Sequence, residues 1–403
     1  PEIDRNPDDV KLFAQKFAVA DLFVLNEGEV AFANVVQTYL DNDGNVEAVK
    51  KSIEVLGNCF LVKNSNEIVA GPSLPRIIEL DDIPSPYLLG LFDKFLGNPS
   101  YMPMVQTNRG CPFSCTFCQV GDSYYTKLKR HSIEYIAEEL NYIVERVAKS
   151  SGLWVTDSNF GMYKQDVETA KVIANLQRTY KYPTILAGSA GKNMPKRIIE
   201  VAKIVKGWVL GSSVQSTDPE VLKSIKRSNI SSNAYKEVID FGNSSTTNKT
   251  YSEAILGLPG DTKHKHFETI RFGVDSNVNR MSMYQAMLLS GTEMASKADR
   301  KKFGLITKFR TIPGCIGIYN ILGNKHSVAE IEEIILGSNT LSTDEYLECR
   351  VMNLIVETFY NNAMFEEVYP MLRALEVSPM DCLIYIKEHP ELYSKKIKEI
   401  LTS

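Results

Sequence analysis

The residues with the clearest chemical potential are three cysteines in an eight-residue stretch, Cys111, Cys115 and Cys118. Their C-x3-C-x2-C spacing, with Gly110 and Pro112 beside the first cysteine, places three thiolates on one tight loop. Such a loop can ligate three irons of a [4Fe-4S] cluster, which leaves the fourth iron open to a small molecule. A structural zinc site would want a fourth cysteine or histidine at close spacing, but the nearest histidine is His131, at the start of a predicted helix, and no second C-x2-C pair follows. We therefore predict a [4Fe-4S] cluster here, with zinc or three structural thiols as alternatives.

The loop lies within a series of alternating predicted strands and helices, which must hold it in place. Short apolar runs predict strands at 104–107, 153–156, 184–187, 208–214, 254–256 and 281–286. Amphipathic runs predict helices at 133–147, 164–179, 194–205, 218–226, 233–241 and 264–275. Six β/α units in series favour a parallel sheet with right-handed crossovers. A closed barrel needs eight such units, so the predicted fold class is α/β with a partial (β/α)6 TIM-like barrel.

The cysteine loop directly follows the first of these strands, where parallel β/α folds carry their active-site loops. This arrangement, over about residues 100 to 300, resembles the radical S-adenosylmethionine (radical SAM) enzymes. The aromatic residue that the family carries just before the third cysteine is here Phe117. The resemblance implies that the open iron binds S-adenosylmethionine. It also implies that an electron from the cluster cleaves this cofactor to a radical that abstracts a substrate hydrogen.

The resemblance also implies cofactor contacts at the ends of the second and fourth strands. Asp157 and Asn159 would meet the amino group of the methionine part, although the usual Gly-Gly-Glu is absent. A helix N-cap and turn is the alternative for these two residues. Ser213 and Gln215 would meet the carboxylate or the ribose, or else form an ordinary polar loop.

The remaining implied contacts lie on the fifth and sixth strands. Adenine would lie against the glycine-rich turn that follows strand five, formed by Gly257, Leu258 and Pro259. Glu253 adjoins the strand predicted at 254–256, which is expected to be otherwise buried on both faces, so it either points into the barrel toward substrate or belongs to a satisfied ion pair. Tyr284 and Gln285, on the sixth strand, are further candidates for the barrel interior.

The order of segments before the barrel resembles the cobalamin-binding branch of this family. That branch typically has a strand ending in Gly-Glu-Gly-Glu, then a helix, a hairpin and a proline-rich linker. Residues 21–29 end in Asn26-Glu27-Gly28-Glu29, and a hairpin at 59–70 and a linker at 71–103 follow. Residues 1–110 contain no histidine, so the Asp-x-His-x-x-Gly cobalt-binding motif is absent. Cobalamin would therefore require sequence that precedes Pro1.

These patterns divide the chain into four regions. Residues 1–70 are expected to be the C-terminal part of an α/β cobalamin-binding-like domain, and 71–103 a linker. Residues 104–325 form the radical SAM barrel, and 326–403 a helical C-terminal region. The missing initiator methionine suggests that the sequence begins inside a longer protein.

The predicted function is reductive cleavage of S-adenosylmethionine to start radical chemistry on an unidentified small molecule. Cobalamin-dependent methyl transfer is one form of that chemistry. A methylthiotransferase-type enzyme and a non-catalytic iron-sulfur or zinc interaction protein are the alternatives. An electron donor such as flavodoxin or ferredoxin is the expected partner.

The composition argues against three classes of protein: nucleic-acid-binding, membrane-spanning and secreted. The 45 Lys and Arg residues against 49 Asp and Glu give a net charge of -4, which argues against a broad nucleic-acid-binding face. No apolar run approaches the ~20 residues of a membrane-spanning helix. The odd count of seven cysteines and the absence of a secretory signal predict a cytoplasmic protein.

Overall fold

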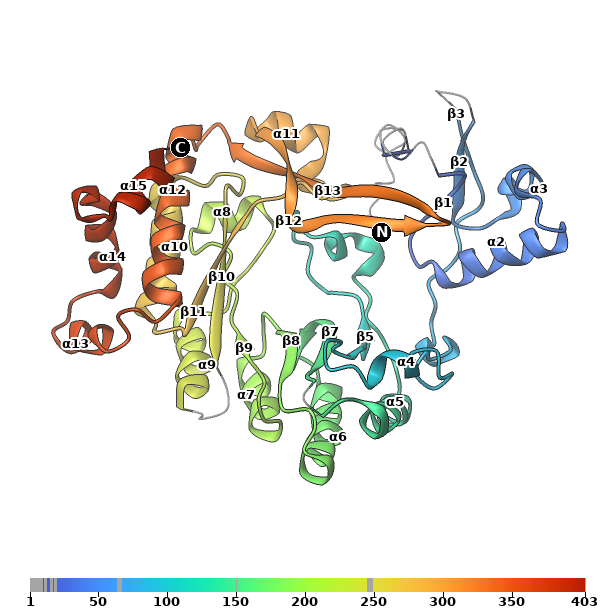
Figure 1. Ribbon diagram of the computed structural model, residues 1–403, viewed down its shortest axis with the longest axis horizontal. Helices are drawn as coiled ribbons and strands as arrows, with labels where there is room; N and C mark the ends of the chain where they lie inside the picture. Colours follow the sequence, from blue (N-terminus) through green and yellow to red (C-terminus); the bar gives the residue numbers. More distant parts are fainter. Residues whose placement is uncertain are drawn as a thin grey trace.

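Six parallel strands follow one another in chain order across the centre of the computed structural model (Figure 1). One sheet has the order β4 (Met104–Val105), β7 (Leu153–Phe160) and β8 (Leu186–Ala190), and another has the order β9 (Leu210–Gly211), β10 (Thr250–Leu256) and β11 (Arg280–Gln285). A parallel bridge between Leu186 and Trp208 joins the two sheets. The structure describes residues 10, 13, 14, 17, 20–63, 67–149, 151–244 and 249–402. Within these ranges β4 and β11 do not pair, so the sheet is open.

Alternation along the strands separates an outer from an inner face. On β7, Leu153 and Val155 are fully buried against the helical layer, whereas Trp154 between them is 48% exposed. On β10, Ser252 and Ala254 are buried, whereas Glu253 between them is only partly buried. Because successive side chains on a strand point to opposite faces, the odd-numbered residues of β10 lie on the inner face.

The six helices lie close to their predicted positions. They are α5 (Ile133–Arg146), α6 (Lys164–Tyr180), α7 (Pro195–Ile204), α8 (Pro219–Ser224), α9 (Ser232–Ser244) and α10 (Lys263–Asp275). Ser132 caps α5 by accepting the N–H of Tyr135 at 3.0 Å, and Asp218 caps α8 by accepting the N–H groups of Glu220 and Val221. The predicted strand at 208–214 is shorter than expected: β9 spans Leu210–Gly211, with single bridges at Trp208 and Gln215.

A small α/β unit precedes the central sheet. Its antiparallel strands are β1 (Phe23–Val24), β2 (Cys59–Lys63) and β3 (Glu67–Ala70), in the order β1-β2-β3. Its helices are α2 (Glu29–Asp41), α3 (Val46–Lys51) and η1 (Ile53–Val55). The predicted turn at 64–66 lies outside the described residues. The linker contains two short helices, η3 (Leu80–Asp82) and α4 (Asp93–Leu96).

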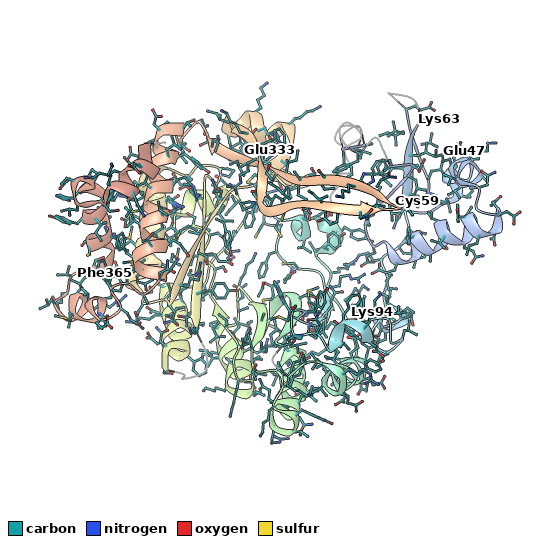
Figure 2. The ribbon with its side chains drawn as sticks, in the orientation of Figure 1. Glu47, Cys59, Lys63, Lys94, Glu333 and Phe365 are labelled. Atoms are coloured by element: carbon teal, nitrogen blue, oxygen red, sulfur yellow. The ribbon has the colours of Figure 1, made fainter. Side chains whose placement is uncertain are left out.

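A long antiparallel ribbon corrects the prediction for the C-terminal part. After η6 (Glu293–Ala295) and α11 (Lys297–Phe303), β12 (Ile306–Ile321) pairs with β13 (Asn324–Gly337). Residues 326–337 are therefore strand and not helix. Glu333 lies at the base of this ribbon (Figure 2). A single antiparallel bridge between Met287 and Ile334 joins β13 to the chain just beyond β11.

Helices follow the ribbon to the end of the described chain. They are α12 (Thr343–Ile355), η7 (Val356–Asn361), α13 (Val368–Ala374), α14 (Pro379–Glu388), η8 (Pro390–Leu392) and α15 (Lys395–Thr402). Buried side chains of α12, η7 and α14 share one apolar cluster with α10, β10 and β11. In the described residues, no helix has the length and apolar character that crossing a bilayer requires.

Candidate functional site

The three cysteines lie on a lobe of residues 108–130 that closes on itself. Its two legs, β5 (Asn108–Arg109) and β6 (Lys129–Arg130), pair antiparallel, and η4 (Gln119–Gly121) and η5 (Ser123–Tyr125) lie between them. The N–H of Cys111 donates to the carbonyl of Tyr125 at 2.9 Å. Gly110 has a φ of 118°, and a Cβ there would lie 2.6 Å from the same carbonyl oxygen. Only glycine allows the first leg to approach the second this closely.

Side-chain donors approach the cysteine sulfurs from neighbouring strand ends. The Nδ2 of Asn159, on β7, lies 3.2 Å from the Sγ of Cys111. The Nζ of Lys192, just after β8, lies 2.9 Å from the Sγ of Cys115. Burial raises the pKa of the Cys118 thiol, and a backbone hydrogen bond from Val120 opposes this rise. Donors to sulfur stabilise thiolates, which is the form that ligates metal.

This arrangement fits a cluster better than a single ion. Within the described ranges, no three His, Cys, Asp or Glu side chains are grouped as ligands of one metal ion. Three thiolates that each bind a different iron of a [4Fe-4S] cluster need not converge on one point. Cys111, Cys115 and Cys118 are free, and all three line the same cavity.

That cavity collects residues from the carboxyl ends of successive strands. Besides the cysteines, its lining includes Phe113, Phe117, Ser158, Ser189, Lys192, Ser213, Gln215, Arg227, Tyr251 and Glu253. The predicted residues Phe117, Ser213, Gln215 and Glu253 are thus brought together with the cysteines. The other lining side chains were not predicted from the sequence.

Glu253 is the centre of a small polar group in this cavity. One of its carboxylate oxygens, Oε2, accepts a hydrogen bond from the Ser213 hydroxyl at 2.6 Å and another from Gln215 Nε2 at 3.1 Å. Gln215 adopts a left-handed φ of 62°, which turns the chain after β9. The Oε1 of Gln215 is buried and has no protein partner among the described residues. The group therefore offers a free acceptor to a ligand.

Two cations, Lys192 and Arg227, give the cavity a positive side that the sequence patterns did not predict. Arg227 is only 8% exposed, and its Nε donates to Asn229 Oδ1 at 3.1 Å. Another of its nitrogens donates to the carbonyl of Ser213. Burial lowers the pKa of Arg227, and the nearby Cys115 opposes that effect. Both cations lie in turns that carry no recognisable motif, so no sequence signal placed them here.

Asp157 is not part of the cavity lining. It is 2% exposed, and its carboxylate accepts hydrogen bonds from the backbone N–H groups of Thr107 and Asn108 at 2.8 and 3.2 Å. Asn108 Nδ2 adds a third hydrogen bond at 2.6 Å. Burial raises the pKa of Asp157 to about 6, against the effect of these hydrogen bonds. Its carboxylate holds the start of the cysteine lobe instead of facing a ligand.

The remaining predicted residues divide between inner and outer positions. The Gly257–Pro259 turn is buried, and Leu258 shares an apolar cluster with Phe117. Tyr284 pairs with the inner-face residue Ile255 and is 53% exposed. Gln285 points to the opposite face, where it hydrogen-bonds Tyr346 and Arg310, so its predicted place in the barrel interior is wrong.

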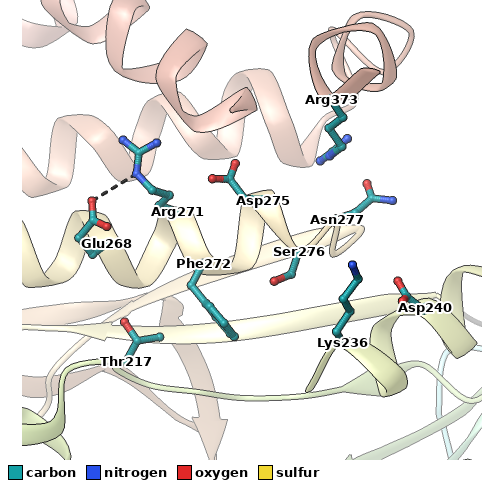
Figure 3. A pocket seen from close by; sticks show the side chains of 10 residues that line it. All are labelled: Thr217, Lys236, Asp240, Glu268, Arg271, Phe272, Asp275, Ser276, Asn277 and Arg373. Atoms are coloured by element: carbon teal, nitrogen blue, oxygen red, sulfur yellow. Dashed lines mark hydrogen bonds and ion pairs between the residues drawn. The ribbon is translucent and has the colours of Figure 1, made fainter. Parts of the chain in front are cut away.

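A larger cavity of about 680 Å³ lies elsewhere, on the outside of the barrel between α9, α10 and α13 (Figure 3). Three basic and three acidic side chains line it, so their formal charges cancel. Arg271 already pairs with Glu268 at 3.2 Å and with Asp381 at 2.6 Å. Size alone therefore does not identify the functional site, and the cysteine cavity remains the better candidate.

Comparison with known proteins agrees with this site. Residues 105–273 match the Radical SAM superfamily. The chain is 28% identical over 354 residues to the cobalamin-dependent radical SAM methyltransferase TokK of Streptomyces tokunonensis, covering 85% of this chain and 49% of TokK. It is 27% identical to the 2-(S-pantetheinyl)-carbapenam-3-carboxylate methyltransferase of Streptantibioticus cattleyicolor, covering 87% and 50% of the two chains.

Solved structures show the same fold at low identity. The radical S-adenosylmethionine methyltransferase TsrM of Kitasatospora setae, with cobalamin and a [4Fe-4S] cluster bound, superimposes with a TM-score of 0.54 at 11% identity, covering 77% of this chain and 58% of TsrM. The cobalamin-dependent radical enzyme OxsB with aqua-cobalamin gives a TM-score of 0.53 at 13% identity, covering 97% and 60%.

The fold, the cysteine lobe and these matches agree with one another. Residues 105–273 are a radical SAM domain, and the chain as a whole is similar to cobalamin-dependent radical SAM methyltransferases. It spans about half the length of the curated relatives that it matches.

Proposed function

We propose that this chain is the catalytic part of a cobalamin-dependent radical SAM methyltransferase, built on a partial (β/α)6 barrel. The observation that carries the proposal is the cavity in which Cys111, Cys115 and Cys118 face the polar group around Glu253. When bound, the cluster supplies the electron that cleaves S-adenosylmethionine. The similarity to TokK along 85% of the chain supports methyl transfer as the reaction class.

The chain's own residues bind and orient the cofactors. Cys111, Cys115 and Cys118 hold three irons, and Lys192 and Arg227 offset the negative charge that the thiolates bring. Ser213, Gln215 and Glu253 present both donors and acceptors on the opposite wall, which suits the polar groups of S-adenosylmethionine. The turn at Gly257–Pro259 and Phe117 contribute an apolar surface beside them.

The N-terminal unit supports the assignment to the cobalamin branch. Residues 20–70 supply the strand, helix and hairpin that the branch has before its linker, with Glu27 and Glu29 in the expected order. We propose that this unit is the end of a cobalamin-binding domain.

The substrate is a small molecule that enters from the inner face of the sheet. An electron carrier such as flavodoxin or ferredoxin reduces the cluster, and all seven cysteines are free thiols, as the cytoplasm favours.

The test uses the full-length protein, reconstituted anaerobically with iron and sulfide. It is given hydroxocobalamin, a low-potential reductant and S-adenosylmethionine. We expect cobalamin to co-elute with the protein, and both S-adenosylhomocysteine and 5′-deoxyadenosine to form. If 5′-deoxyadenosine forms but cobalamin is not retained and no S-adenosylhomocysteine appears, the methyltransferase proposal is wrong. The protein would then be a radical enzyme that does not transfer methyl groups.

Iron content separates this proposal from the methylthiotransferase alternative. Residues of this chain are 26% identical over 191 positions to the ribosomal protein uS12 methylthiotransferase RimO of Campylobacter jejuni, covering 45% of this chain. A single cluster corresponds to about four irons per chain, and a second cluster would double that value. We expect the lower value; the higher one would favour the methylthiotransferase.

A further inference from the structure

A buried carboxylate links the N-terminal unit to the cysteine lobe. Glu27, between β1 and α2, is 8% exposed. Its Oε1 accepts hydrogen bonds from Arg76 Nε and Nη2 at 3.2 and 3.1 Å, and its Oε2 accepts the N–H of Ile77 at 2.8 Å. Arg109 Nη1 lies 3.8 Å from the same Oε1. A buried charge is tolerated only when it is paired in this way.

The two arginines reach different parts of the lobe. Arg109 is part of the first leg, β5, and directly precedes Gly110 and Cys111. Its Nη2 also pairs with Glu29 Oε1 at 2.8 Å, which ties this leg to the start of α2.

Arg76 contacts the segment that leads into the second leg. Its Nη1 donates to the carbonyl of Lys127 at 2.5 Å. Its guanidinium lies over the rings of Tyr124 and Tyr125, 5.2 and 5.7 Å from their centres. The carbonyl of Tyr125 accepts the N–H of Cys111, so Arg76 is also connected, through Tyr125, to the first cysteine.

We propose that Glu27 is a positioning residue that clamps the two sides of the cysteine lobe and so fixes the approach of Cys111 to its site. Through Arg109 it holds the strand that enters the lobe, and through Arg76 it holds the segment from Tyr124 to Lys127 that leads into the strand leaving the lobe. The N-terminal unit is thereby a structural part of the cluster site. The inference extends the proposed function, because it assumes that the lobe carries the cluster.

Hydrogen exchange of the full-length protein, before and after reconstitution with iron and sulfide, tests this role. Glu27→Gln keeps the size of the side chain but removes its charge. We expect amide exchange in residues 108–128 to rise at least tenfold, with no change in α5 to α7. The reconstituted variant should retain iron but show a broadened electron paramagnetic resonance signal, and Glu27→Asp should partly restore the wild-type signal.

The matched control is Glu47→Gln, in the same unit on the exposed helix α3 (Figure 2). Glu47 pairs with Lys50 at 2.9 Å. We expect no change in the lobe for this variant. Faster exchange confined to residues 20–70, or spread evenly over the chain, would overturn the clamp. If the wild type takes up no iron, the proposed function fails, but the exchange comparison without iron still tests Glu27.

Discussion

At the scale of single residues, the candidate site depends on what surrounds the three sulfurs. Asn159 and Lys192 each bring a donor to a different cysteine, and Arg227 adds a second cation, which is buried. Hydrogen bonds and positive charge near cluster sulfurs make reduction easier. These residues are therefore expected to influence how readily the cluster accepts an electron.

Replacement of Lys192 tests that expectation. We predict that Lys192→Met makes the cluster harder to reduce, because the variant loses a cation 2.9 Å from Cys115 Sγ. At a fixed applied potential, the ratio of reduced to oxidised cluster should fall by up to about tenfold, or ~59 mV for one electron. Spectroscopic redox titration measures this ratio. Lys196→Met, on the exposed side of α7, is the control, and an equal shift in both variants would refute the prediction.

The cysteine cluster could be predicted from spacing alone, whereas the cations around it could not. Cys111, Cys115 and Cys118 are close in sequence, so their proximity in space is unavoidable. Lys192 is 77 residues from Cys115, and only the crossover connections of the sheet bring the two together. Likewise, alternation on β11 implies that only one of Tyr284 and Gln285 can face inward, but the strand pattern did not show which.

At the scale of helices and strands, amphipathic periodicity gave the best predictions. The helices α5, α6 and α10 begin and end close to their predicted bounds, because their buried residues recur with helical spacing. The ribbon was missed because helical spacing of apolar residues is not unique to helices. Its apolar residues at 331, 334, 335 and 336 also suit a helix, and much of its surface is exposed, so burial leaves no clear pattern.

The ribbon's attachment is the second prediction. Arg300 on α11 contacts both carboxylate oxygens of Glu333, at 2.5 and 2.7 Å. Because both side chains are partly exposed, we expect Arg300→Met to lower the free energy of unfolding by only about 1–2 kcal/mol. The loss should be local, with faster hydrogen exchange or proteolysis in 306–337. Lys301→Met, on the exposed face of the same helix, should leave the ribbon unchanged; equal effects would contradict the assignment.

The contact between α10 and α12 is the basis of the third prediction. His266 is 2% exposed, and its Nε2 lies 2.9 Å from Asn353 Oδ1. Burial lowers the pKa of His266 from 6.5 to about 4, so the folded state holds the neutral ring. Stability from this residue is present above pH 6.5 and is lost as the pH falls toward 4. At ~1.4 kcal/mol per pKa unit, the loss is about 3 kcal/mol.

Denaturant unfolding of wild type and His266→Gln between pH 7.5 and 4.5 measures this loss. The comparison is needed because Asp157 and Asp166, whose pKa values burial raises to about 6, act with the opposite sign. Their contribution is present at low pH and is lost as the pH rises. We expect the wild type to lose stability on acidification relative to the variant. Parallel curves for the two proteins would contradict the buried neutral histidine.

At the scale of the whole molecule, two regions line one cavity and a third supports it. The central sheet supplies the strand ends, the lobe supplies the cysteines, and the N-terminal unit reaches the lobe through Glu27. The fold class followed from six β/α units in series, whereas the contact between the N-terminal unit and the lobe depends on Glu27 and two arginines that lie about 50 and 80 residues further along the chain. Sequence order could place these regions in series but could not show which surfaces they share.

The central claim is that the cysteine lobe carries a cluster that cleaves S-adenosylmethionine. Its most direct test is anaerobic reconstitution with iron and sulfide, followed by reduction in the presence of S-adenosylmethionine and measurement of 5′-deoxyadenosine. We predict that the wild type forms this product and that Cys115→Ala, which removes one of the three ligands, does not. A colourless protein that binds one zinc ion and forms no 5′-deoxyadenosine would contradict the claim.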